Sequence, residues 1–213
     1  MNAPAHTRIK FCGMTRADDI ALACELGVDA VGLVFAQRST RRLTIEQASA
    51  LRAGIAEGIE VVALFMDNDA AHVQRVIDEV RPTLLQFHGS EDEAFCAAFG
   101  VPYLKAVAMG GEVATDALSH HPGAVALLLD SHASGGAGGT GHRFDWSQIP
   151  ADSGRRVLLA GGLDPENIFE AVSAVHPWGV DVSSGIESAP GEKDAAKMQR
   201  FVEEVRRADG ASP

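Results

Sequence analysis

Cysteine is scarce in this sequence. Its three cysteines, Cys12, Cys24 and Cys96, are an odd number in a chain of 213 residues, and a chain of this length does not need disulfide staples to fold. Cys24 and Cys96 fall within predicted helices, where a small buried hydrophobic residue is expected. We therefore predict no disulfide bond and a reduced, cytoplasmic location.

Long apolar runs are missing as well. The N-terminal residues, MNAPAHTR, contain no apolar stretch after their charges. No segment approaches the roughly 18 apolar residues that a membrane-spanning helix needs. The sequence predicts neither a secretory leader nor a membrane span, which agrees with a cytoplasmic protein.

Positive charge is in short supply. The 18 lysines and arginines stand against 29 aspartates and glutamates, which gives a formal net charge of −11. A field of this sign repels phosphate polymers and anionic lipid, so neither nucleic acid nor a membrane surface is expected as a partner. A small anionic substrate needs only a local positive pocket and stays possible.

Signatures of metal and cofactor binding are also lacking. The eight histidines and three cysteines show no paired ligand spacing. No phosphate-loop lysine follows a glycine run, and no GxGxxG follows the first predicted strand. We predict no metal and no cofactor.

What the sequence does contain is a regular alternation of apolar runs and helical segments. We predict eight strands, at residues 8–12, 30–35, 60–66, 83–89, 102–109, 124–130, 157–160 and 179–182. Helices are predicted after Thr15, Thr44 and Asp164, and over residues 70–80, 91–99, 113–120 and 194–207.

Eight strand-and-helix units predict an α/β fold, a (β/α)8 TIM barrel. We place it in a single domain over residues 8–207, with flexible tails at 1–7 and 208–213. A doubly wound open sheet is the structural alternative. That fold carries its phosphate signal early in the chain, whereas here the signal comes late.

The late signal is the segment 157–185. Its first strand breaks at Gly161-Gly162 and its second at Ser183-Ser184-Gly185, with a helix start at Asp164 between them. In a barrel, the loops after strands seven and eight commonly bind phosphate through free backbone N–H groups. We predict a phosphate site there.

A glycine-rich segment, SHASGGAGGTGHRFDW at residues 131–146, follows the sixth strand. Nothing in it can pack a core or form a long helix. A flexible linker is one interpretation. A mobile lid fits better, because the segment lies on the face where barrel chemistry happens.

Two side chains at strand ends form a candidate acid–base pair. Cys12 ends the first strand and Asp130 ends the sixth, so both should face the barrel mouth. Taken alone, a free cysteine is more often a packing residue, and an aspartate after a strand often caps a loop. Together they suit proton transfer on a sugar or carbonyl.

Other polar residues follow the same strand ends. His88, after the fourth strand, is a third participant or a hydrogen-bonded structural residue. Arg41 and Arg42, after the second, either bind a carboxylate through the guanidinium fork or form a solvated cluster. Asp181 lies in the eighth strand.

Five segments, in order along nearly the whole chain, resemble the phosphoribosylanthranilate isomerase family. They are KFCGMT at 10–15, LQFHGSE at 85–91, GGTGHRFDW at 138–146, AGGLDPENI at 160–168 and DVSSGIE at 181–187. The resemblance implies a TIM barrel that converts N-(5-phosphoribosyl)anthranilate to 1-(2-carboxyphenylamino)-1-deoxyribulose 5-phosphate, an Amadori rearrangement in tryptophan biosynthesis that needs no cofactor.

The resemblance also implies roles for individual residues. Cys12 is the general base that removes the C2′ proton, Asp130 is the general acid on the furanose ring oxygen, and Arg41 holds the anthranilate carboxylate. Threonine and a second arginine, Arg42, depart from the usual S-P-R of that loop. The other substrate-binding residues are His88, Gly138, Gly139, Gly161, Gly162, Asp181, Ser183, Ser184 and Gly185.

Two rival functions stay open. Another phosphosugar barrel, such as the isomerase of histidine synthesis or indole-glycerol phosphate synthase, would keep the phosphate site but use aspartates, or lysine and glutamate, for chemistry. A non-catalytic phosphometabolite sensor would need no acid–base pair. In each case the expected partner is a small anionic phosphosugar, and the protein is expected as a monomer or a weak homodimer.

Overall fold

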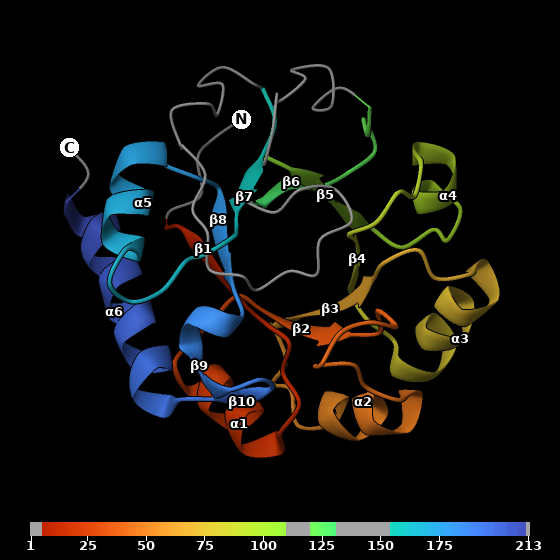
Figure 1. The fold of residues 1–213 in the computed structure, drawn as a ribbon, viewed down its shortest axis with the longest axis horizontal. Coiled ribbons are helices and arrows are strands. Elements are labelled where there is room, and N and C mark those ends of the chain that lie inside the picture. The colour runs from red at the N-terminus through yellow and green to blue at the C-terminus, as the bar shows by residue number, and fades with distance from the viewer. Residues whose placement is uncertain (1–5, 110–119, 131–153, 212–213) are drawn as a thin grey trace.

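Eight parallel strands, each paired with its neighbours in chain order, close into a barrel (Figure 1). The computed structural model describes residues 6–109, 120–130 and 154–211. The strands are β1 (Arg8–Cys12), β2 (Ala30–Val34), β3 (Glu60–Phe65), β4 (Leu84–Phe87), β5 (Tyr103–Ala108), β6 (Ala126–Asp130), β7 (Val157–Leu159) and β8 (Gly179–Val182). The predicted TIM barrel is confirmed.

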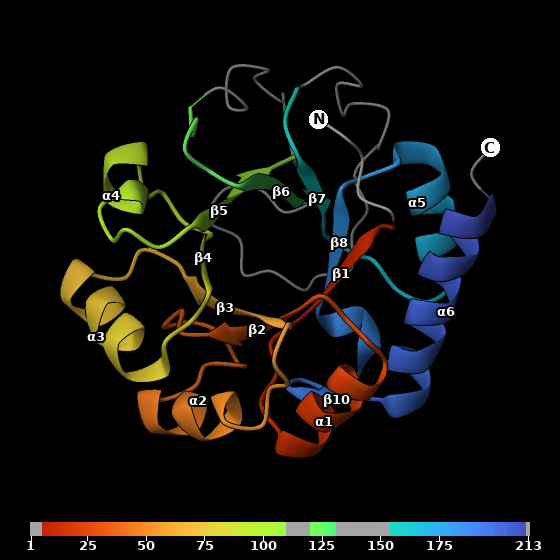
Figure 2. The ribbon, with the colours of Figure 1, turned by 180° about the vertical axis from the view of Figure 1, so that it is seen from behind.

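Helices surround the ring of strands. They are α1 (Ala17–Glu25), α2 (Ile45–Arg52), α3 (Ala70–Val80), α4 (Glu93–Ala97), α5 (Ile168–Val175) and α6 (Ala195–Ala211). Figures 1 and 2 show α1 to α4 along one side of the barrel and α5 with α6 along another. The helix expected at 113–120 and the lid expected at 131–146 fall on residues outside the described ranges, apart from His120.

The predicted start of α2 is confirmed and that of α1 is wrong. The Thr44 hydroxyl accepts from the Gln47 N–H, and the Gln47 side chain accepts from the Thr44 N–H, which closes a capping box. Thr15 was expected to do the same for α1. Its hydroxyl instead donates to the Gly191 carbonyl, and the helix begins at Ala17 without a side-chain cap.

The two last helices also differ at their ends. The Asp164 carboxylate accepts from the N–H groups of Glu166 and Asn167, as a cap would, but α5 itself starts only at Ile168. Residues 208–211, expected in a flexible tail, belong to α6, because Ala208 packs into the core at 1% exposure. Asp209 accepts hydrogen bonds from Thr7, which ties this helix to the start of β1.

The core has an outer and an inner layer. Outward-facing residues of the strands pack against the helices, and the rings of Phe65 and Phe87 stack there with that of Phe35, which follows β2. Inward-facing residues such as Val62 and Leu128 pack together and fill the interior of the barrel. Each fully buried aliphatic side chain contributes about 1.5–3 kcal/mol. The rigid barrel therefore fixes the positions of the residues at its strand ends.

A small antiparallel hairpin follows β8 and was not predicted. A short 3-10 helix, η3 (Ser184–Ile186), leads into β9 (Glu187–Ala189), which pairs with β10 (Glu192–Lys193). The hairpin packs its polar residues against the ends of β1 and β8, as described below. Within the described ranges, no helix is long and apolar enough to cross a membrane.

Candidate active site

A pocket of about 240 Å³ opens where the carboxyl ends of the strands meet. Most of the sequence-predicted site residues contribute to it. Its described lining includes Cys12, Arg41, His88, Asp130, Gly161, Gly162, Asp181, Ser183 and Ser184. Parallel strands of a closed barrel all end at the same rim, which is why residues as far apart in the sequence as Cys12 and Ser184 converge here.

Cys12 and Asp130 reach the pocket from strands that are not neighbours. β1 pairs with β2 and β8, whereas β6 pairs with β5 and β7. The two side chains therefore approach a ligand from different sides. Both are nearly buried, at 5% and 7% exposure, so a ligand that fills the pocket shields them from water.

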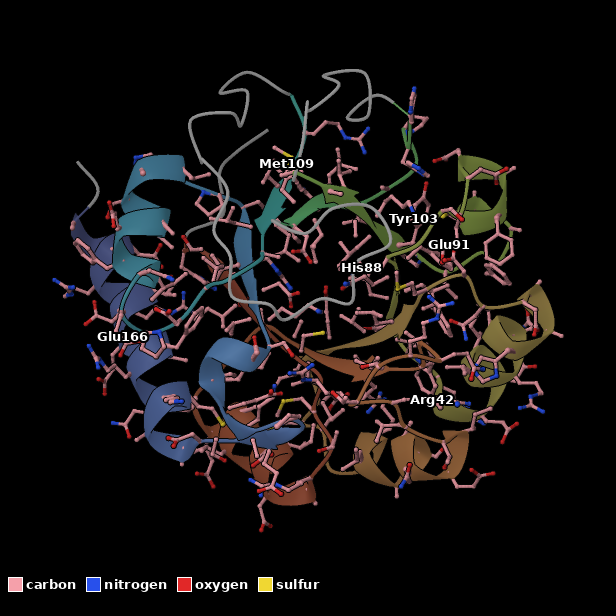
Figure 3. All side chains as sticks on the ribbon, viewed as in Figure 1. Arg42, His88, Glu91, Tyr103, Met109 and Glu166 are labelled. Carbon is pink, nitrogen blue, oxygen red and sulfur yellow. The ribbon has the colours of Figure 1, made fainter. Side chains whose placement is uncertain are left out.

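His88 lies beside the carboxylate of Asp130. Its Nε2 is 3.2 Å from Asp130 Oδ2, and Gln86 Nε2 is 3.3 Å from His88 Nδ1. If Gln86 donates to Nδ1, the His88 proton sits on Nε2 and points at the carboxylate. The chain of contacts fixes the orientation of Asp130, and Figure 3 shows His88 inside the ring of strands.

Arg41 is held by a carboxylate that the sequence did not single out. Its Nε is 2.7 Å from Glu187 Oε1 and its Nη2 is 2.5 Å from Glu187 Oε2, a bidentate ion pair. These bonds use two of the five N–H donors of a guanidinium. Arg42 is exposed and lies towards α2 at the outside of the barrel (Figure 3). Arg41, not Arg42, lines the pocket.

Lys193 of the hairpin connects three parts of the rim. Its buried ammonium donates to the carbonyls of Cys12 and Ser183, at 2.7 and 3.0 Å, and to Glu187 Oε1 at 2.8 Å. An ammonium has three donors, and all three are used. Burial alone would raise the pKa of Glu187, but the bonds and charges of Arg41 and Lys193 outweigh it and hold that pKa low.

The loops after β7 and β8 form one end of the pocket. Gly161 and Gly162 have φ of 80° and 65°, a conformation that favours glycine, and they line the pocket together with Ser183 and Ser184. Gly185 packs against the neighbouring loop instead, because a Cβ there would lie 1.9 Å from the Leu163 carbonyl oxygen. Two of the expected phosphate-binding residues, Gly138 and Gly139, lie outside the described residues.

Two buried charges lie next to Cys12. Lys10, two residues earlier on β1, pairs with Asp181 at 2.6 Å. Asp181 was predicted to contact substrate; it lines the pocket and also holds Lys10. Lys10 was not predicted, although the period of two along a strand puts it on the same face as Cys12. Burial raises the pKa of the Cys12 thiol, and the Lys10 charge opposes that shift.

No metal centre forms among residues 6–109, 120–130 and 154–211, where no group of three or more histidine, cysteine, aspartate or glutamate side chains could hold an ion. The polar groups of the pocket include a thiol, two carboxyl groups, an imidazole, guanidinium groups, hydroxyl groups and the amide side chain of Gln86. Such a set can bind a dianion and a carboxylate and move protons between them.

The whole chain is similar to known isomerases. The model of the N-(5'-phosphoribosyl)anthranilate (PRA) isomerase family matches residues 9–204. N-(5'-phosphoribosyl)anthranilate isomerase of Stenotrophomonas maltophilia (strain R551-3) is 59% identical over 206 residues, which are 95% of this chain and 94% of that protein.

Solved structures agree. Phosphoribosyl anthranilate isomerase from Thermotoga maritima is 32% identical, with a TM-score of 0.87 over 94% of this chain and 99% of that one. A second structure of a phosphoribosyl anthranilate isomerase, also 32% identical and with the same coverage, has a TM-score of 0.84. It was solved in complex with reduced 1-(o-carboxyphenylamino)-1-deoxyribulose 5-phosphate.

Proposed function

The chain belongs to the N-(5'-phosphoribosyl)anthranilate isomerase family, and from this premise we propose how its pocket performs the reaction. The reaction converts N-(5-phosphoribosyl)anthranilate to 1-(2-carboxyphenylamino)-1-deoxyribulose 5-phosphate in tryptophan biosynthesis. The observation that supports the division of roles is the meeting of Cys12 and Asp130 in one pocket with Arg41. A sensor without chemistry and the barrels of other pathways are set aside by the family match.

Asp130 acts first, as general acid. It gives its proton to the furanose ring oxygen as the bond from that oxygen to C1′ breaks, and the nitrogen lone pair forms a C1′=N iminium. His88 keeps the carboxyl group aimed at the ring oxygen. A positioned acid of this kind is worth about 10²–10⁴ in rate.

Cys12 acts second, as general base. The iminium withdraws electrons from C2′, so the thiolate can remove the C2′ proton. The C–H electrons then form a C1′=C2′ double bond, and the π electrons of the C1′=N bond return to the nitrogen. The resulting enolamine becomes the ketone when its hydroxyl loses a proton and C1′ gains one. The proton left on Cys12 and the one missing from Asp130 then exchange with solvent, so no external oxidant or cofactor enters the balance.

A direct assay tests this function. Freshly made N-(5-phosphoribosyl)anthranilate is fluorescent, and the isomerase should remove that fluorescence at a rate proportional to protein concentration. The product has the same mass as the substrate, because the reaction is an isomerisation, so it should be identified by its ketone. Protein that leaves the fluorescence unchanged while binding the substrate would show a binding module and not an enzyme.

Arg41 is expected to hold the anthranilate carboxylate. Arg41→Gln should raise KM by about 10- to 100-fold, the worth of a charge-assisted bidentate bond, and leave kcat less affected, because the carboxylate is remote from the reacting carbons. Arg42→Gln is the matched control, since Arg42 is exposed, and its KM should stay near the wild-type value. Steady-state kinetics of the two variants, which give KM and kcat for each, test the assignment. Equal effects at both positions would contradict the assignment.

The loops at Gly161, Gly162, Ser183 and Ser184 are expected to hold the 5′-phosphate. Gly162→Asp should raise KM by about 100-fold or more, because a carboxylate within a few Å repels a dianion. Gly162→Asn is the control: it has the same shape, tolerates the φ of 65° equally, and carries no charge, so its KM should rise far less. Competition by inorganic phosphate should weaken in parallel. If Gly162→Asn raised KM as much as Gly162→Asp, backbone strain and not charge would be responsible for the increase.

We also propose that the protein works in the cytoplasm as a monomer or weak homodimer and takes a small phosphosugar. Its net charge of −11 favours neither nucleic acid nor anionic lipid as a partner. Size-exclusion chromatography with light scattering, at protein concentrations spanning two decades, measures the oligomeric state directly.

A further inference from the structure

Lys10 and Cys12 share the inner face of β1. They are two residues apart, so both side chains point into the barrel. In the strand register Lys10 lies opposite Asp181 of β8, and Cys12 lies opposite Gly32 of β2. The Lys10 side chain is 1% exposed, and its Nζ is 2.6 Å from Asp181 Oδ1. The Lys10 ammonium is therefore a fully buried cation that lies two residues before the thiol, on the same face of β1.

Gly32 leaves a gap that the thiol and the ammonium both reach. A Cβ at this position would lie 2.8 Å from Cys12 Sγ and 3.2 Å from Lys10 Nζ. Any other residue at position 32 would therefore press on both groups. The absence of a side chain on β2 is what allows the Lys10 ammonium to approach the sulfur.

We propose that Lys10 is a positioning residue that supplies the counter-charge for the Cys12 thiolate, and that the negative charge of Asp181, which pairs with the same ammonium, opposes ionisation of the thiol. The inference rests on the proposed role of Cys12 as the general base. A thiolate that loses water is destabilised unless a cation stands nearby. Cys12 and Asp181 belong to the described pocket lining and Lys10 does not, so Lys10 acts through Cys12 and not on the substrate.

Charged and titratable groups face Cys12 from several elements. They are Lys10 on β1, Asp181 on β8, Lys193 on β10, Arg41 in the loop after β2, and across the pocket His88 and Asp130. Burial raises the pKa of Cys12, Asp181 adds to that rise, and Lys10 and Lys193 oppose it. Burial lowers the pKa of Lys10, but the charges of Asp181 and Cys12 outweigh it, so Lys10 stays a cation while Cys12 ionises.

The experiment measures the ionisation of Cys12 without using catalysis. The full-length protein is alkylated with iodoacetamide at a series of pH values, and mass spectrometry follows the Cys12 peptide separately from those of Cys24 and Cys96. The pH midpoint of the rate reports the thiol pKa. Lys10→Met should move the midpoint up by about one to two units, so that alkylation at neutral pH slows about 10- to 100-fold.

Asp181→Asn gives a test of sign. It removes the anion and leaves the cation, so the Cys12 midpoint should move down, opposite to the effect of Lys10→Met. A purely structural role would not produce opposite shifts. Thermal unfolding shows whether Lys10→Met folds. If it does not, Asp181→Asn alone still tests the proposal: a Cys12 alkylation midpoint that rises or stays in place in this variant overturns it.

Lys105→Met is the matched control. Lys105 is also a buried lysine on a strand, paired at 3.0 Å with Glu91, but it belongs to β5. Its loss should leave the Cys12 midpoint within about 0.3 units of wild type, a change small against the one to two units expected for Lys10. A midpoint that is unmoved by Lys10→Met, or that moves equally in the Lys105 variant, overturns the proposal.

The kinetic readout separates this proposal from the one it rests on. The acid limb of kcat/KM should shift in Lys10→Met by the same amount as the alkylation midpoint. If alkylation shifts as expected but Cys12→Ser keeps full turnover, Lys10 still tunes the thiol and only the role of Cys12 as base is lost. If alkylation does not shift, Lys10 is not the counter-charge, whatever Cys12 does.

Discussion

Asp130→Asn should slow turnover by about 10²–10⁴-fold while binding stays near wild type. Asparagine keeps the shape of aspartate and can still contact His88, which lies 3.2 Å from the carboxylate. It has no acidic proton to give to the ring oxygen, however, so the C1′–O bond must break without assistance. Single-turnover kinetics and the affinity for the reduced product analogue separate the loss of chemistry from a loss of binding.

The assignment of Asp130 to ring opening can be checked with substrate carrying deuterium at C2′. In Asp130→Asn ring opening becomes rate-limiting, so the isotope effect on kcat should shrink towards one. Asp69→Asn is a matched control: Asp69 caps α3 through a bond to the His72 N–H, and asparagine caps equally well. Its turnover should stay within about twofold of wild type, since surface changes of this kind cost little. An Asp130→Asn variant that keeps a large isotope effect would show that the acid step lies elsewhere.

The barrel and the meeting of Cys12 with Asp130 could be predicted because both depend on local signals. Each strand shows as an apolar run bounded by turn residues, and the closed parallel topology alone brings the strand ends together. The ends of β1 and β6 were therefore enough to place a thiol and a carboxyl group in one pocket. No long-range contact had to be known in advance.

The support around these groups could not be predicted in the same way. Glu187 meets Arg41 across 146 positions, and Lys193 meets the Cys12 carbonyl across 181. Neither contact leaves a local pattern. The hairpin that makes both contacts possible does have a turn signal, Pro190-Gly191 between two short polar runs. The segment lacks the apolar alternation that predicts a strand, however, so the turn signal alone does not predict a hairpin.

The wrong prediction at the start of α1 has a physical cause. Thr15 satisfies the sequence pattern of a cap, but its hydroxyl bonds to Gly191 of the hairpin, so a tertiary contact competes successfully with the local one. Lys10 likewise shows that a tertiary contact cannot be predicted from local sequence alone. Its position on the inner face of β1 can be read from the alternation, but its ion pair depends on the register that places Asp181 beside it.

Cys12→Ser should abolish most turnover, by about 10²–10⁴-fold, because a serine hydroxyl has a pKa far too high to act as a base near neutral pH. Cys12→Ala should be just as slow if the thiolate is the base, since neither side chain can accept the C2′ proton. Both variants should still bind the reduced product analogue. The C2′ isotope effect should persist or grow in them, opposite to Asp130→Asn, because proton removal becomes the slow step.

The pH profile gives an independent signature of the thiol. Burial raises the pKa of Cys12 above its usual value, and only the thiolate is active, so kcat/KM of the wild type should rise with pH and fall as acid protonates the sulfur. The acid limb should vanish in Cys12→Ser. If Cys12→Ser kept more than about a tenth of wild-type kcat, the loss would be smaller than even a weak base should cause. The base would then be a different residue, and His88, which shares the pocket, is the next candidate. A His88→Gln variant would then lose the acid limb while Cys12→Ser kept it.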